Sequence, residues 1–184
     1  MESTGLDARE RSALAKLLEW SAGELLRHAV ALKDHQWLFR PEPAAWSLAQ
    51  VVEHLILTER GITARLAALT EKYPPSAARQ NETAGKEELI LRTLPDRKTP
   101  MAAPSIVEPH QEGPLLVTLE DFLALRNRSI AYIRTTTHDL HGYYSNHAAL
   151  NVLDGYQWYL LIAVHTERHA AQIAEYKSHP GFPA

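Results

Sequence analysis

The chain has 184 residues, of which 45% are hydrophobic, and this size and composition indicate one globular domain rather than a disordered segment. Its 19 lysine and arginine residues against 22 aspartate and glutamate residues give a formal net charge of -3, which argues against a nucleic-acid partner. The absence of cysteine excludes disulfides, thiolate ligands and a cysteine nucleophile, so any metal site must use His, Asp or Glu ligands.

The sequence also bears on location. Residues 1–11 are polar and carry charges of both signs, without the apolar segment of a secretory signal. The longest apolar run, residues 159–164, is far too short to cross a membrane. We therefore expect a soluble cytoplasmic protein that has no membrane partner.

A first helix is predicted to begin at Asp7, because Glu10 three residues later completes a capping box. It is expected to run to about Phe39, before Pro41 and Pro43. Its apolar face carries Leu14, Leu17, Leu18, Leu25, Ala29 and Leu32 at helical spacing.

A second helix is predicted to begin at Ser47, with Gln50 as the partner in its capping box, and to end before Pro74 and Pro75. One face carries Val51, Leu55, Ile62, Leu66 and Leu69. The long proline-rich stretch over residues 74–117 follows, with one short helix predicted from Glu82 to Leu94. A connection of this length in a compact domain is usually functional or disordered. It is expected to cross between the halves of the molecule, either covering one end of an active site or forming a passive strap.

A third helix is predicted from Thr118, with Asp121 in the capping position and an apolar face that includes Phe122, Leu123, Ile130 and Ile133. Residues 146–153 are expected to form a loop that leads into the fourth helix.

The fourth helix is predicted to begin at Asp154, with Gln157 in its capping box, and to continue to about Ser178. Four long helices and almost no alternating strand pattern predict an all-α four-helix bundle. We expect the bundle to form a single domain over residues 1–184, with the long crossover between its second and third helices.

His165 and His169 are the strongest chemical signal. Their i, i+4 spacing puts both imidazoles on one helix face, the arrangement that two ligands of a single ion need. The same face carries Trp158, Leu161, Ile162, Gln172, Ile173 and Tyr176. Burying two imidazoles is costly unless each has a partner, so either a shared metal ion or hydrogen bonds within the core must satisfy them.

His54 lies at the edge of the apolar face of the second helix, from which it could lean toward the fourth helix. Spacing alone does not select it over His28, His35 or His147.

Several other residues are weaker candidates. Gln172 is interpreted either as a hydrogen-bond partner of a ligand or as a satisfied core amide. Arg126 interrupts the apolar face of the third helix, either to meet an anionic substrate group or to extend its charged end to solvent. His147 either approaches the mouth of the site or lies on the surface, where the remaining histidines are expected. Aromatic packing is the expected role of Tyr156, Trp158 and Tyr176.

Two parts of the sequence resemble the DinB/YfiT-like superfamily. Residues 46–55, Trp-Ser-Leu-Ala-Gln-Val-Val-Glu-His-Leu, resemble the signature of its second helix. Residues 153–158, Leu-Asp-Gly-Tyr-Gln-Trp, followed by 165–173, His-Thr-Glu-Arg-His-Ala-Ala-Gln-Ile, resemble its final helix. The resemblance extends through residues 180–183 and covers essentially the whole chain.

This resemblance implies a four-helix bundle with a three-histidine metal site, in which His54, His165 and His169 are the ligands. It also implies a homodimer. Zinc or nickel would suit three imidazoles, and the type of ligand does not choose between them. Three protein ligands leave positions on the ion open for water or substrate, as in catalytic sites.

Characterised relatives include thiol-dependent S-transferases and a thiol-dependent isomerase, so the resemblance implies activation of a low-molecular-weight thiol as thiolate, with a small-molecule electrophile as substrate. No catalytic side chain is assigned. One alternative is a metal-dependent hydrolase, which would need a base near the ion. Glu167 lies about 200° around the helix from His165 and should face away. The string from His165 to His169 is also not His-Glu-x-x-His. The other alternative is a non-catalytic module that binds a metal or a small ligand.

Overall fold

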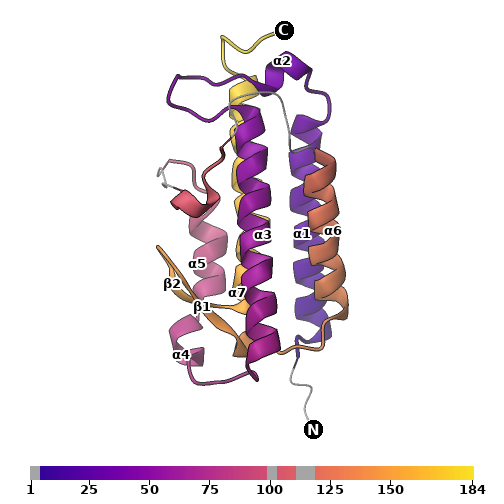
Figure 1. Ribbon diagram of the computed structural model, residues 1–184, viewed down its shortest axis with the longest axis vertical. Helices are drawn as coiled ribbons and strands as arrows, with labels where there is room; N and C mark the ends of the chain where they lie inside the picture. The colour runs from indigo at the N-terminus through magenta and orange to yellow at the C-terminus, as the bar shows by residue number, and fades with distance from the viewer. Residues whose placement is uncertain (1–4, 99–102, 111–118) are drawn as a thin grey trace.

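The chain forms a bundle of four long helices with a small sheet beside it (Figure 1). A computed structural model describes residues 5–98, 103–110 and 119–184. The long helices are α1 (Ala8–Ala29), α3 (Leu48–Lys72), α6 (Leu119–Thr135) and α7 (Gly155–Lys177). The shorter elements are α2 (Asp34–Trp37), α4 (Gln80–Thr83), α5 (Lys86–Thr93), the 3-10 turns η1 (Ser105–Val107) and η2 (Leu140–Gly142), and the strands β1 (Tyr144–His147) and β2 (Asn151–Asp154). The predicted all-α four-helix bundle is confirmed.

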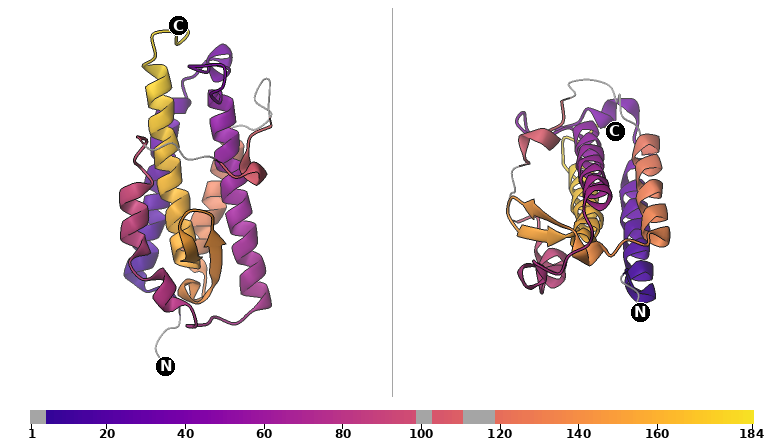
Figure 2. Two further views of the ribbon diagram at one scale, coloured as in Figure 1. Left: turned by 90° about the vertical axis from the view of Figure 1, so that its left-hand side faces the viewer. Right: turned by 60° about the horizontal axis from the view of Figure 1, so that its bottom comes forward.

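The direction of the helices decides which residues meet. Helices α1 and α7 run one way along the bundle, and α3 and α6 run the other way (Figures 1 and 2). Each long helix packs on two others, in the cyclic order α1, α6, α3, α7. Because α3 and α7 are antiparallel neighbours, early residues of α3 lie beside later residues of α7. In the described part of the chain, no helix is both long and apolar enough to span a membrane.

Three predicted helix starts are confirmed, because each has a complete capping box in which side chain and backbone exchange hydrogen bonds. The pairs are Asp7 with Glu10, Ser47 with Gln50, and Asp154 with Gln157. The predicted start of the third helix, Thr118, lies outside the described residues, and the described part of α6 begins at Leu119.

The prediction of one helix from Asp7 to Phe39 is wrong, because α1 ends at Ala29 and a separate turn, α2, follows. Gln36 explains the break. Its Oε1 accepts a hydrogen bond from the backbone N–H of Lys33 at 2.9 Å, and its Nε2 donates to the carbonyl oxygen of Pro183 at 2.8 Å. The C-terminal tail thus stabilises a new helix start within a segment whose apolar spacing favours continuation.

The crossover is packed on the bundle over its described residues, 74–98 and 103–110. The single helix predicted over Glu82 to Leu94 is replaced by α4 and α5, which Gly85 separates with a φ of 75°. That left-handed conformation favours glycine. Helix α5 packs on α7 and η1 packs on α3, so the crossover flanks the side of the bundle where α3 and α7 meet (Figure 2).

The loop predicted over residues 146–153 is wrong, since this region belongs to a hairpin. Strands β1 and β2 pair antiparallel, with Tyr144 opposite Asp154 and His147 opposite Asn151. The sequence of β1 is Tyr-Ser-Asn-His, and none of these residues is buried. It lacks the alternation of apolar and polar residues from which a strand is predicted.

A polar layer separates two apolar clusters inside the bundle. At its centre Arg126, with 0% of its side chain exposed, pairs with Glu59 through an Nη2–Oε2 distance of 2.9 Å. Arg126 also donates to the carbonyl of Leu18 and the hydroxyl of Ser21, both at 2.9 Å, and to Thr166 Oγ1 at 2.8 Å. Arg126 therefore joins all four long helices, and the interpretation that it extends its charged end to solvent is wrong. Its donors are taken up by protein groups instead of an open substrate site.

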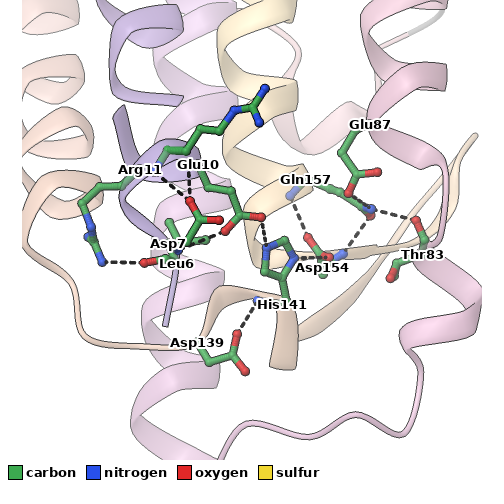
Figure 3. A network of polar contacts seen from close by, with 11 residues as sticks. Leu6, Asp7, Glu10, Arg11, Thr83, Glu87, Asp139, His141, Asp154 and Gln157 are labelled. Atoms are coloured by element: carbon green, nitrogen blue, oxygen red, sulfur yellow. Dashed lines mark hydrogen bonds and ion pairs between the residues drawn. The ribbon is translucent and has the colours of Figure 1, made fainter. Parts of the chain in front are cut away.

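His141 connects the N-terminal ends of α1 and α7 (Figure 3). Its Nδ1 donates to Asp154 Oδ2 at 3.0 Å and its Nε2 to Glu10 Oε1 at 3.2 Å. The hydrogen bond to Asp154 is the main reason that the pKa of His141 is raised to about 9. His141 was expected on the surface; its side chain is 31% exposed, and the ring also joins these two helix ends.

Candidate metal centre

His54 of α3 and His165 and His169 of α7 meet where these two helices pack. The Nε2 atom of His165 lies 3.2 Å from that of His54 and 3.1 Å from that of His169. His54 and His169 are buried, whereas His165 is partly exposed. The structure thus brings together all three residues that the resemblance implies as ligands.

The geometry follows from two simple features of the sequence. The i, i+4 spacing on α7 places the ring centroids of His165 and His169 4.5 Å apart. The capping box at Ser47 fixes the start of α3, and the antiparallel packing of α3 on α7 brings His54 to the same level. The Trp46 ring packs on the His54 ring at a centroid distance of 4.8 Å.

Hydrogen bonds to the outer nitrogens fix two of the three rings. His54 Nδ1 donates to the carbonyl oxygen of Val107 at 2.7 Å, and His169 Nδ1 donates to Gln172 Oε1 at 2.7 Å. Gln172 in turn donates from Nε2 to the hydroxyl of Tyr176 at 3.0 Å. With the proton on Nδ1, each neutral ring turns the lone pair of Nε2 toward the centre of the cluster.

The surroundings keep the imidazoles neutral. Burial lowers the pKa of His54, and it lowers the pKa of His165 well below its usual range. Burial also lowers the pKa of His169 to about 3, with a further contribution from the nearby His54 ring. Neutral imidazole is the form that binds metal ions.

The donor set fits a divalent ion. Four-coordinate zinc with bonds of about 2.0–2.1 Å to nitrogen places its ligand atoms about 3.3–3.4 Å apart, close to the distances found here. A proton on His165 Nε2 could satisfy only one of its two contacts with the neighbouring rings. In the other contact, two Nε2 lone pairs would face each other with no proton between them. A shared cation would satisfy the lone pairs of all three rings. In the described residues, no carboxylate joins the cluster.

The structure also places the weaker candidates. Gln172 is a partner of His169, and its amide is satisfied as well, so both interpretations hold. His147 packs against the Trp158 ring, with 5.4 Å between the ring centroids. Burial raises the pKa of Glu167, and the nearby Glu24 of α1 raises it further, so this carboxylate lies on the α1 side of the helix. His35 lies away from the centre and contacts the carbonyl of Ala184.

Sequence reasoning missed the partners that support the site. The carbonyl of Val107 gives no signal in a sequence, because every residue carries one. Glu59 does give a signal: it interrupts the apolar face of α3 as Arg126 interrupts that of α6, and two opposite charges on facing apolar surfaces predict a buried pair.

The fold and the cluster define a class of protein: a helical bundle with a candidate three-histidine metal centre between two of its long helices. The chain belongs to the DinB superfamily, which matches residues 17–173. It is similar in structure to YfiT from Bacillus subtilis, described as a probable metal-dependent hydrolase with an unusual four-helix bundle topology. The two share 18% sequence identity and a TM-score of 0.61 over 97% of this chain and 92% of that one, which shows a common fold. A comparison with curated protein sequences gives no match.

Proposed function

We propose that the chain is a metal-dependent enzyme that joins a low-molecular-weight thiol to an electrophilic small molecule. The three histidines would hold a divalent ion, zinc or nickel. The observation that carries the proposal is the convergence of three neutral imidazoles, with Nε2 distances of 3.1 and 3.2 Å, at a centre that no carboxylate of the described residues joins.

A divalent ion held by three imidazoles would lower the pKa of a thiol or a water molecule and stabilise the resulting anion. The protein contributes the orientation of its own side chains. Val107 and Gln172 hold the rings of His54 and His169, and the buried position of both rings excludes water from their side of the centre. Since the chain has no cysteine, the sulfur nucleophile must arrive on the cosubstrate. The sulfur would form a bond to the electrophilic carbon, and the leaving group would depart with the bonding electron pair.

Hydrolysis is the second candidate function, and the description of YfiT as a probable metal-dependent hydrolase favours it. A water molecule would then replace the thiol. Two glutamates are poorly suited to act as its base, since Glu167 lies toward α1 and Glu59 is held by Arg126. If neither glutamate can act as a base, thiol transfer is favoured over hydrolysis, because a thiol ionises more readily than water.

Turnover by metal-loaded protein separates the candidates. The protein is loaded with zinc or nickel and incubated with glutathione, bacillithiol or mycothiol and a panel of aryl and alkyl halides, and the thioether is measured by mass spectrometry. Thioether that forms only with metal and is lost in His165→Ala supports the transferase. Cleavage of nitrophenyl esters without thiol supports the hydrolase instead. Tight metal binding without either reaction identifies a binding module and contradicts both enzymatic proposals.

A further inference from the structure

Two buried polar groups on the helices that carry the histidine centre lack a hydrogen-bond partner within the described residues. They are the indole Nε1–H of Trp158 and the hydroxyl of Thr58. Thr58 follows His54 by one helical turn on α3, and Trp158 precedes His165 by seven residues on α7, so both lie on the helix faces that carry the histidines. Only 5% of Trp158 is exposed. A buried indole N–H without an acceptor is costly, and such a group indicates an acceptor that the protein does not itself supply.

Two further donors flank the Trp158 ring. The guanidinium carbon of Arg65 lies 5.3 Å from the ring centre, and the His147 ring lies 5.4 Å away between centroids. His147 Nδ1 accepts hydrogen bonds from the backbone N–H groups of Ala149 and Leu150, both at 3.1 Å. The neutral His147 ring must therefore carry its proton on Nε2, which makes that atom a donor.

Arg65 and His147 both lie against the Trp158 ring, and we call these three side chains, together with Thr58 on the same face of α3 as Arg65, the donor patch. Trp158 and the neutral His147 offer N–H groups, and Thr58 offers a hydroxyl. Arg65 adds a positive charge, and it forms no ion pair with an acidic residue of the described part of the chain. Arg65 donates from one nitrogen to Ser145 Oγ at 3.3 Å and has further donors left over. Burial, Arg65 and Lys86 lower the pKa of His147, in keeping with a positive local field.

There is also room beside the patch. Of the patch, His147 alone lines a hollow of about 350 Å³ between α5 and the hairpin, which Arg92, Leu150 and the acidic Asp96 also line. A volume of this size suits a small molecule.

We infer that the donor patch binds a carboxylate of the substrate next to the histidine centre, so that the natural substrate is a small molecule bearing both an electrophilic carbon and a carboxylate. This inference rests on the proposed function and narrows its substrate class. Two neutral N–H donors with one guanidinium match the single charge and two oxygens of a carboxylate, whereas a phosphate dianion would call for more positive charge.

The indole N–H of Trp158 is a direct reporter of this contact. Its resonance is recorded in ¹⁵N-labelled full-length protein by two-dimensional NMR and assigned with Trp158→Phe, first without metal and then after loading with zinc. Acetate is titrated as the probe, and acetamide serves as the neutral analogue of the same shape. The exposed Trp20 provides an internal reference, since it lies on α1 at 47% exposure.

Acetate is expected to move the Trp158 resonance downfield in a saturable way, and acetamide to move it far less. Arg65→Met should weaken acetate binding about tenfold, because it removes a charged hydrogen bond. The matched control Arg60→Met, at an exposed position of the same helix, should leave binding unchanged. Thr58→Val keeps the shape of the side chain and should weaken binding less than Arg65→Met.

Three results would overturn the inference: no shift of the Trp158 resonance with acetate, equal shifts with acetamide, or equal binding by the Arg65 and Arg60 variants. These outcomes are read from the NMR titration and do not depend on turnover. Failure to take up zinc is measured separately, by metal analysis of the same samples, and counts against the proposed function alone.

Discussion

The Nε2 atom of His54 lies 3.2 Å from the Nε2 atom of His165, although the two residues are 111 positions apart in the chain. The contact exists because α3 and α7 are antiparallel and because η1 of the crossover holds the His54 ring from the other side. The centre is thus assembled by the fold itself, and a metal ion would enter a set of ligands already in place. Preformed ligands lose little side-chain entropy on binding, which favours high affinity.

We expect His54→Ala, His165→Ala and His169→Ala each to weaken zinc binding by more than about a hundredfold, because each change removes a ligand rather than its outer partner. Metal content of untagged protein, measured by inductively coupled plasma mass spectrometry after competition with a chelator, tests this. His35→Ala is the control, since His35 lies far from the centre at the C-terminal tail. Loss of metal in only one of the three variants would contradict the three-ligand assignment.

Gln172→Leu should weaken zinc binding about 10–100-fold while leaving the protein folded, because His169 loses the acceptor for its Nδ1–H. Gln172→Glu keeps an acceptor oxygen at this place and should bind zinc at least as tightly as wild type. Both affinities are measured by chelator competition, with circular dichroism to check the helical content. Equal weakening in both variants would show that Gln172 acts only through packing.

Arg126→Met should lower the free energy of unfolding by about 3–5 kcal/mol, because it leaves Glu59 as an unpaired buried charge. The double variant Arg126→Met/Glu59→Leu should recover most of this loss, since it removes both charges together. Urea unfolding gives the free energies, and Arg128→Met, at an exposed position two residues away, is the matched control. A double variant less stable than Arg126→Met would mean that the polar layer stabilises the fold by more than mutual neutralisation.

The His141 contact should make stability depend on pH in the alkaline range. Its pKa is raised from 6.5 to about 9 in the folded protein, so the stabilisation is fully present below about pH 6.5 and is lost as pH rises through about 9. His141→Gln should therefore cost about 1–2 kcal/mol near pH 6 and almost nothing near pH 10.

Thermal melts of wild type and His141→Gln over this pH range measure the difference. The two acidic partners of the ring are Asp154 and Glu10, and Asp139 accepts a hydrogen bond from the His141 backbone N–H (Figure 3). A difference in melting temperature that stays constant with pH would contradict the role of the charged ring.

Local signals in the sequence predicted the parts of the fold that short-range chemistry decides. The capping boxes at Ser47 and Asp154 are such signals, because both partners lie three residues apart. The i, i+4 spacing likewise predicted that His165 and His169 share a face. His54 was different, because spacing alone did not select it over His28, His35 or His147 as the third ligand. Only the resemblance to a family selected it.

What the sequence did not predict depends on contacts between distant segments. The break after α1 requires Pro183 at the other end of the chain, and the hairpin consists of strands too short and too exposed to show a pattern. The partners of the Arg126–Glu59 pair lie 67 positions apart in the chain. Homodimer formation stays a prediction from the resemblance, and the cytoplasmic location one from composition.

The carbonyl of Val107 holds His54 through the backbone, and this has a consequence for how the protein can vary among relatives. No side chain at position 107 takes part in that hydrogen bond, so the residue type there is free to drift as long as η1 keeps its turn. Alanine substitutions at Ser105–Val107 should therefore leave the hydrogen bond to His54 intact. Insertion or deletion of a residue within η1 would have a different effect. It would move the carbonyl of Val107 away from His54 Nδ1, and the ring would then be free to rotate.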